Sequence, residues 1–191
     1  MAAPIESGSR TTSGSYTLPV PAWANVIDFF LLGGGNDGSD GTTYGSGSRG
    51  ADGEYVTGSF RVRPGSSLPC SIAAAGGNTT INFGGVVSSS GTGPTKPSSN
   101  TLTNSSLMEG DPAVASSWSV NVGSRGDGGA GGSSGGGSGA PGTGGGLYWR
   151  FRIAAQTPRV GTKLVEDIRI GSKQVQAIYI GTKKVWEKPV N

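Results

Sequence analysis

The sequence predicts a mainly β protein, with a glycine-rich, β-sandwich-like domain that includes polyglycine helices, followed by a short C-terminal ribbon of repeated β-hairpins. Short segments of alternating apolar and polar residues, separated by Gly and Pro, predict the strands. Glycine makes up 37 of the 191 residues and hydrophobic residues only 33%, so the core must be thin. A unit repeated every ten residues near the end predicts the ribbon. We therefore expect an arm over 1–15, a glycine-rich β domain over 16–155 and the ribbon over 156–191.

The first element, residues 1–15, is polar, and we expect it to be an arm or an extension bound to a partner. The segment 23–32 is the most apolar of the chain, and its run Phe29-Phe30-Leu31-Leu32 is typical of a strand buried on both faces. In 54–62 the apolar residues alternate with polar ones and place Val56, Phe60 and Val62 on one face. The full set of expected strands is 16–20, 23–32, 54–62, 68–75, 79–87, 118–122 and 147–153.

Two glycine tracts interrupt these strands. Residues 33–53 contain nine glycines with no evident period, and residues 121–146 contain fourteen. Such tracts are ordered only if their backbones pack closely and hydrogen-bond to one another, as polyglycine helices laid side by side would. The alternative, that 121–146 is a mobile linker, stays open at this point.

The C-terminal repeat predicts hairpins with two-residue Gly-X loops. A loop at Gly171-Ser172 pairs Ile170 with Lys173 and sets Ile168 across from Val175, and a loop at Gly181-Thr182 sets Ile178 across from Val185. One face of the ribbon is then aliphatic, and strands this short need that face covered, either by the rest of the chain or by other copies. The expected interface between copies consists of Val165, Ile168, Ile170, Val175, Ile178, Ile180 and Val185.

Catalytic chemistry finds little support in the sequence. The chain has no histidine, so the usual activation of a serine or cysteine nucleophile is excluded, and Cys70 is the single cysteine. The run Asn36-Asp37-Gly38-Ser39-Asp40-Gly41 faintly resembles calcium-binding turns but lacks their repeat. Arg125-Gly126-Asp127 spells an integrin-binding tripeptide, which we interpret as a coincidence of composition. We therefore expect no enzyme, no cofactor and no metal site.

The charge is uneven, because residues 159–191 hold seven basic and three acidic groups. A nucleic-acid partner is not expected, since no aromatic residues are interleaved with these cations to stack on bases. The N-terminal residues lack the pattern of a secretory signal, and we expect synthesis in the cytoplasm.

Four aromatic residues are candidates for packing against sugar rings: Trp118, Tyr148, Trp149 and Tyr179. The alternative for Tyr148 and Trp149 is that they are core residues on opposite faces of the closing strand.

The order of these parts resembles a known family. Val20-Pro21-Ala22-Trp23, an apolar strand, Gly33-Gly34-Gly35, the strand 54–62 with Arg63-Pro64-Gly65, the long glycine tract and the closing Gly146-Leu147-Tyr148-Trp149-Arg150 are similar to the glycine-rich domain of bacteriophage tail proteins. The ten-residue repeat ending in Val185-Trp186-Glu187 resembles the tails of minor tail proteins from phages of mycobacteria and related actinobacteria.

The resemblance implies a virion structural protein of the tail tip, made in the host cytoplasm and assembled as a homotrimer. Its implied partners are other tail-tip proteins, copies of itself and bacterial envelope glycan at host attachment. The alternative function is a secreted glycine-rich surface or matrix protein of a cell, and an envelope-degrading hydrolase is disfavoured by the missing catalytic residues.

Overall fold

The computed structural model describes residues 4–89, 94–97, 101–104 and 118–153, and the backbone of short strands between 159 and 187. The chain divides into two units, Met1–Ile153 and Ala154–Asn191. The division lies two residues from the expected boundary. The described residues contain many β-strands and no α-helix, so the prediction of a mainly β fold is confirmed. No helix in the described part of the chain is long and apolar enough to span a membrane.

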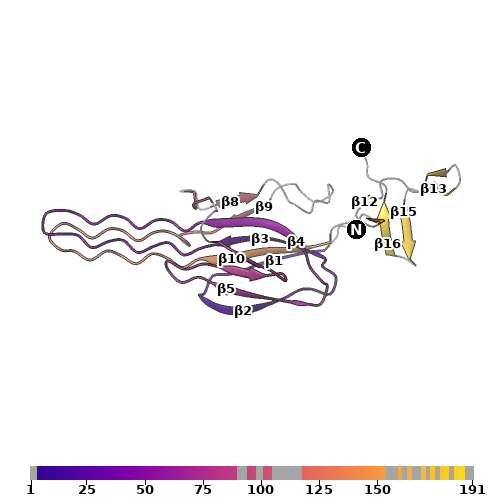
Figure 1. The fold of residues 1–191 in the computed structure, drawn as a ribbon, viewed down its shortest axis with the longest axis horizontal. Coiled ribbons are helices and arrows are strands. Elements are labelled where there is room, and N and C mark those ends of the chain that lie inside the picture. Colours follow the sequence, from indigo (N-terminus) through magenta and orange to yellow (C-terminus); the bar gives the residue numbers. More distant parts are fainter. Residues whose placement is uncertain are drawn as a thin grey trace. The chain divides into compact units, whose positions relative to one another are not determined.

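The body of the first unit consists of two four-stranded antiparallel sheets (Figure 1). Their inner faces enclose one apolar core, to which Phe29 and Trp149 contribute from the first sheet and Leu68 and Ile81 from the second. This arrangement is a β-sandwich, as expected. The first sheet has the order β1 (Ile5–Arg10), β10 (Gly146–Arg152), β3 (Val26–Leu32), β4 (Tyr55–Arg61), and the second β2 (Gly14–Pro19), β5 (Ser67–Ile72), β6 (Thr80–Asn82), β7 (Val86–Ser88).

Strand β3 is buried along its whole length, as its sequence predicts. Alternate residues such as Ile27 and Phe29 face the core between the sheets, whereas Phe30 and Leu32 belong to a second cluster on the outer face of the first sheet. The hairpin of β8 (Thr101–Asn104) and β9 (Trp118–Asn121) contributes to that cluster through Leu102 and other apolar residues.

The outer face of the first sheet also buries a charge cluster. Asp28 on β3 is fully buried and lies between Arg150 and Arg152 of β10. The Arg150 Nε donates to Asp28 Oδ2 at 2.9 Å, the Arg152 Nη2 donates to Oδ1 at 3.0 Å, and the Ser59 hydroxyl donates to Oδ1 at 2.6 Å. A charge removed from water needs such partners, so this cluster fixes the register of β3 and β10.

Two of the predictions about individual segments are wrong. Residues 1–15 are not an arm, because Ile5–Arg10 forms the edge strand β1 and pairs with β10 along its whole length. The segment 79–87 is not one strand but two, β6 and β7, joined by a turn in which Gly84 has a φ of 99°. That backbone conformation is one that glycine adopts readily.

The described strands of the second unit form three hairpins: β11 (Arg159–Val160) with β12 (Lys163–Leu164), β13 (Arg169–Ile170) with β14 (Lys173–Gln174), and β15 (Ala177–Ile180) with β16 (Lys183–Glu187). The predicted pairing of Ile170 with Lys173 is confirmed. The pairing of Ile178 with Val185 is wrong, because a register irregularity sets Ile178 opposite Trp186. An extra residue in one strand produces such a shift. The pairing of Ile168 with Val175 lies outside the described residues.

Candidate functional site: a bundle of glycine helices

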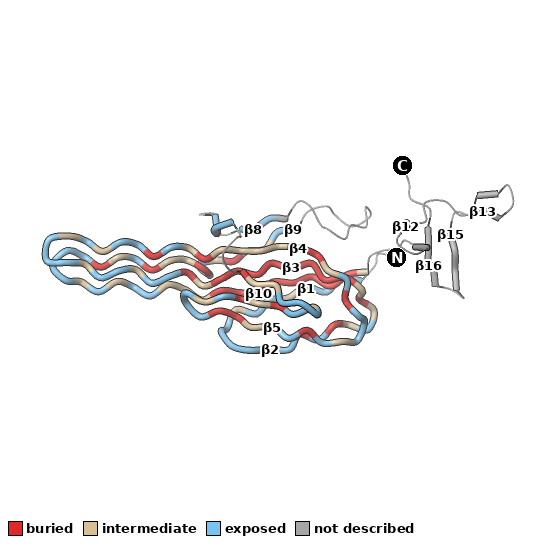
Figure 2. Tube along the Cα trace, viewed as in Figure 1, coloured by how far each residue is buried: buried red, intermediate tan, exposed pale blue. Residues whose placement is uncertain are grey.

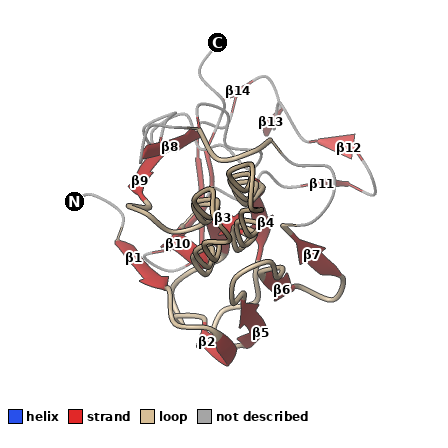
Figure 3. Cartoon of the chain, turned by 90° about the vertical axis from the view of Figure 1, so that its left-hand side faces the viewer, coloured by secondary structure: helices blue, strands red, loops and turns tan. Residues whose placement is uncertain are grey.

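The two glycine tracts are ordered, and the hydrogen bonds between their parts divide them into four extended helical segments. These segments project together from the sandwich (Figure 1). Seen end-on, the segments appear as separate coils (Figure 3). We name them helix I (33–42), helix II (45–53), helix III (126–133) and helix IV (137–145), and the whole the glycine bundle. Their glycines, apart from Gly126 at the base, have no positive φ, and their hydrogen bonds recur every third residue. Both features are those of the polyproline II conformation, which has about three residues per turn. The linker alternative for 121–146 is therefore wrong.

The body of the protein sets the place of three of these helices. Helix I continues β3, helix II leads into β4, and helix IV leads into β10. Because β3 pairs with both β4 and β10, helix I lies between helices II and IV. At about 3.1 Å per residue, the ten residues of helix I extend roughly 30 Å.

Backbone hydrogen bonds between helices replace the missing side-chain core. The residues of helix I follow a pattern of three. The amide of the first residue donates to helix IV, the amide of the second donates to helix II, and the third residue is exposed. Helix III in turn donates to helix I through Gly129 and Gly132. The donors from helix I to helix IV are Gly35, Gly38 and Gly41, at 2.8–2.9 Å from their acceptors, and those to helix II are Asn36, Ser39 and Thr42, at 2.7–3.0 Å.

Close approach between backbones, rather than φ, requires glycine here. At each contact between two helices, a Cβ on one of them would lie only 1.8–2.2 Å from a carbonyl oxygen of the other. Helices I, II and IV each approach one neighbour this closely, and each has one glycine at the contact in every three residues. Helix III approaches both helix II and helix IV this closely, and it has two such glycines in every three residues. The glycines concerned are Gly35, Gly38 and Gly41 toward helix III; Gly47, Gly50 and Gly53 toward helix I; Gly139 and Gly142 toward helix I; Gly128 and Gly131 toward helix II; and Gly129 and Gly132 toward helix IV.

The period of three is also visible in burial (Figure 2). Gly126, Gly129 and Gly132 of helix III are buried, and the residues between them are more exposed. The expectation that 33–53 has no period is therefore wrong. The signal was present in the spacing of glycines, but it is neither the period of two of a strand nor the 3.6 of an α-helix.

Aspartates on the bundle satisfy amides that the helices leave unpaired. Asp37 and Asp40 of helix I accept hydrogen bonds from the amides of Gly142 and Gly139, each at 2.8 Å. The faint resemblance of this segment to a calcium turn therefore has a structural explanation. Among the described residues, no three His, Cys, Asp or Glu side chains lie close enough together to hold a metal ion.

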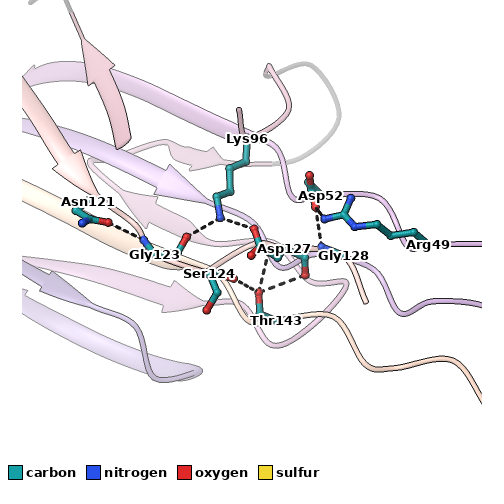
Figure 4. A network of polar contacts seen from close by, with 9 residues as sticks. All are labelled: Arg49, Asp52, Lys96, Asn121, Gly123, Ser124, Asp127, Gly128 and Thr143. Carbon is teal, nitrogen blue, oxygen red and sulfur yellow. Dashed lines mark hydrogen bonds and ion pairs between the residues drawn. The ribbon is translucent and has the colours of Figure 1, made fainter. Parts of the chain in front are cut away.

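A polar network fastens the base of the bundle to the body (Figure 4). The side chain of Lys96 is only 2% exposed and donates to the Gly123 carbonyl at 2.7 Å and to the Asp127 carboxylate. The Thr143 hydroxyl accepts from the Asp127 amide at 2.8 Å and donates to the Ser124 carbonyl at 2.6 Å. This network engages the carboxylate of the Arg125-Gly126-Asp127 tripeptide, in agreement with its interpretation as coincidence.

Asp52 of helix II belongs to the same network (Figure 4). Its Oδ1 pairs with the Arg49 guanidinium at 2.5 Å and accepts from the Gly128 amide at 2.8 Å. The hydrogen bond from Arg49, followed by that from Gly128, holds the pKa of the Asp52 carboxyl below its usual value.

The far end of the bundle consists of two turns (Figures 1 and 3). In the first, the Thr42 amide donates to the Gly45 carbonyl at 2.7 Å, and Tyr44 occupies the corner. The second runs over 133–137 and is joined to the first because the Gly135 amide donates to the Thr42 carbonyl at 2.8 Å. Tyr44 is 97% exposed, the most exposed large apolar side chain among the described residues.

The four aromatic residues predicted as candidates for sugar contact differ in where they lie. Tyr148 and Trp149 are buried in the two apolar clusters, on opposite faces of β10, so their prediction as glycan contacts is wrong and the core alternative is confirmed. Trp118 is half-buried, with its ring 5.1 Å from that of Phe30 and 5.3 Å from the Arg150 guanidinium. The side chain of Tyr179 lies outside the described residues.

The predicted interface between copies remains a prediction. Val165, Ile168 and Val175 lie outside the described residues. For Ile170, Ile178, Ile180 and Val185 the structure describes the backbone alone.

The comparisons with known proteins place the chain in no family. No family model matches it, and no curated protein matches it.

Proposed function

We propose that this chain is a structural subunit of a phage tail tip, that it assembles as a homotrimer, and that it contributes to attachment to the host surface. The observation that carries the proposal is the glycine bundle, a projection from a sandwich body that is stiffened by peptide hydrogen bonds rather than by an apolar core. A protein that must present a surface at a distance from its anchoring body needs such a stiff element.

The exposed chemistry of the bundle supports a presenting role over a catalytic one. Glycine, serine, threonine and alanine predominate along it, and its aspartates are engaged by amides and by basic side chains. Rigid positioning of a few side chains suits recognition, because little entropy is lost when such a surface binds.

The ribbon supplies the assembly part of the proposal. Hairpins of two to five residues per strand bury too little apolar surface to be stable alone. In a homotrimer each copy of the chain would contribute the same ribbon surface. A closed symmetric assembly is built from such identical surfaces.

The location is tested by labelling particles of the phage that encodes the chain with antibodies against the sandwich body. Gold label at the tail tip is the expected result. Label that is absent from particles and present on the surface of cells would instead favour the alternative, a glycine-rich surface or matrix protein.

The assembly is tested by sedimentation of the purified chain at micromolar concentration. We expect a mass three times the 19.0 kDa of the chain, and monomers when Ile168 and Ile178 are both replaced with Asp. Replacing Lys173 and Lys183 with Gln in the same ribbon is the matched control and should leave the trimer intact. A wild-type protein that sediments as a monomer would contradict the trimer.

A further inference from the structure

We propose that the two turns at the far end of the glycine bundle form a binding site for a neutral sugar, with the ring of Tyr44 as its stacking platform. The inference rests on the proposed attachment role and specifies the ligand class. Tyr44 is 97% exposed, and the turn in which it lies is held by the hydrogen bond from the Thr42 amide to the Gly45 carbonyl. The backbone that carries the ring is thus held in place, and both faces of the ring are open to solvent.

Packing and folding give no reason for an aromatic residue at this corner. Every other described aromatic side chain is buried or half-buried, and the residues on either side of Tyr44 are threonine and glycine. An exposed ring on an otherwise small-residue surface gains free energy only when a ligand covers it.

The surroundings of Tyr44 fit a neutral sugar. Residues 41–48 and 128–149 contain no Asp, Glu, Lys or Arg, so the turns carry no formal charge. They offer the hydroxyls of threonine and serine beside one aromatic face, and sugars are bound through both, since their C–H faces pack on rings and their hydroxyls exchange hydrogen bonds. The hydroxyl residues of the two turns are Thr42, Thr43, Ser133 and Ser134.

Other ligands fit less well. An anionic ligand would need cations, which the two turns lack. A protein partner typically takes about 20–30 residues per side, more than two short turns supply. A small, neutral surface with one aromatic platform suits a terminal or branching sugar unit.

The test uses the full chain and an array of neutral oligosaccharides of hexoses and pentoses, with anionic oligosaccharides as a second panel. We expect at least one neutral oligosaccharide to bind and to give saturation-transfer signals in NMR from the sugar face that covers the ring. The substitution Tyr44→Ala should weaken binding about tenfold or more, whereas Tyr44→Phe, which keeps the ring, should stay within about threefold of wild type.

Two controls separate the site from its alternatives. Val86→Ala removes another exposed apolar side chain, 67% exposed on the sandwich body, and should leave binding unchanged. Because Tyr44 contributes to no described cluster, Tyr44→Ala should also keep the thermal midpoint of wild type. No binding of any neutral oligosaccharide at about 1 mM, binding of anionic ones alone, or equal binding by Tyr44→Ala would each overturn the proposal. Gold label at the tail tip of particles carrying Tyr44→Ala would show that the proposed function survives such a failure.

Discussion

Replacing Gly129 with Ala tests whether the glycine bundle is held by close contact between backbones. Gly129 is buried in helix III, and a Cβ there would lie 1.9 Å from the carbonyl oxygen of Ala140 on helix IV. Real Cβ atoms essentially never approach another atom within 3.0 Å. Helices III and IV must therefore separate by about 1 Å or more to admit one methyl group.

The cost follows from the hydrogen bonds that such a separation breaks. Between helices III and IV, the Ala140 amide donates to the Ala130 carbonyl at 2.7 Å, the Thr143 amide donates to the Asp127 carbonyl at 2.9 Å, and the Gly126 amide donates to the Gly144 carbonyl at 3.1 Å. Loss of two or three such bonds costs about 1 kcal/mol each, and overpacking adds about 1–3 kcal/mol. Alanine also restricts the unfolded chain, which offsets about 0.4–1 kcal/mol. We expect a net loss of about 3 kcal/mol in the free energy of unfolding, or a thermal midpoint lower by about 6–12 °C.

The matched control is Gly85→Ala. A Cβ at Gly85 would meet nothing within 4 Å, and its φ lies outside the positive region that disfavours alanine. This substitution should leave the protein as stable as wild type or slightly more stable. Calorimetry measures the midpoints, and hydrogen exchange of amides 126–145 shows whether the loss is local to the bundle. Equal midpoints for Gly129→Ala and Gly85→Ala would refute the close-contact argument.

Two further predictions concern charged groups. Asp28→Ala should lower the free energy of unfolding by about 3–5 kcal/mol in urea titrations, because it leaves the buried Arg150 and Arg152 without the carboxylate they share, and a loss below 1 kcal/mol would contradict the role of the cluster. Asp52→Asn should cost less than about 1 kcal/mol, since Arg49 is 56% exposed, and should do so only above about pH 4. The folded pKa of Asp52 is lowered, so its contribution is present above the unfolded pKa and is lost as pH falls through the folded one. Urea titrations of both proteins from pH 7 to pH 2 measure this, and a difference that grows toward acid would contradict the sign.

The sandwich could be predicted where side chains determine burial. Val26–Leu32 is apolar on both faces, and 54–62 alternates, so β3 and β4 follow from their side chains. Strand β1 could not be found in this way. It lies at the edge of the sheet with few apolar residues, and its Gly8 is required because a Cβ there would meet the Trp149 ring at 2.6 Å. A strand with one apolar residue and a required glycine gives no apolar pattern.

The candidate site could be predicted less well, for the same reason. The expectation that ordered glycine tracts pack as polyglycine helices is confirmed, but neither the number of helices nor their neighbours follows from composition. Those are set by the pairing of β3 with β4 and β10, which the helices continue. Tyr44 was not among the aromatic candidates, although it is the one aromatic residue inside a glycine tract.

The atoms that stabilise the bundle are not the side chains exposed at its turns, and this property suits the proposed attachment role. Packing in the bundle uses peptide groups and the space left by glycine, so side chains at the turns take no part in it. Residues such as Thr43, Tyr44 and Ser134 can therefore be exchanged without changing the packed interior. In a scaffold held by packed side chains, by contrast, any position whose side chain reaches the core tolerates little change in volume. If the proposed sugar site exists, a bundle held by backbone atoms would let the sugar it binds change through substitutions at the turns, while the support stays the same.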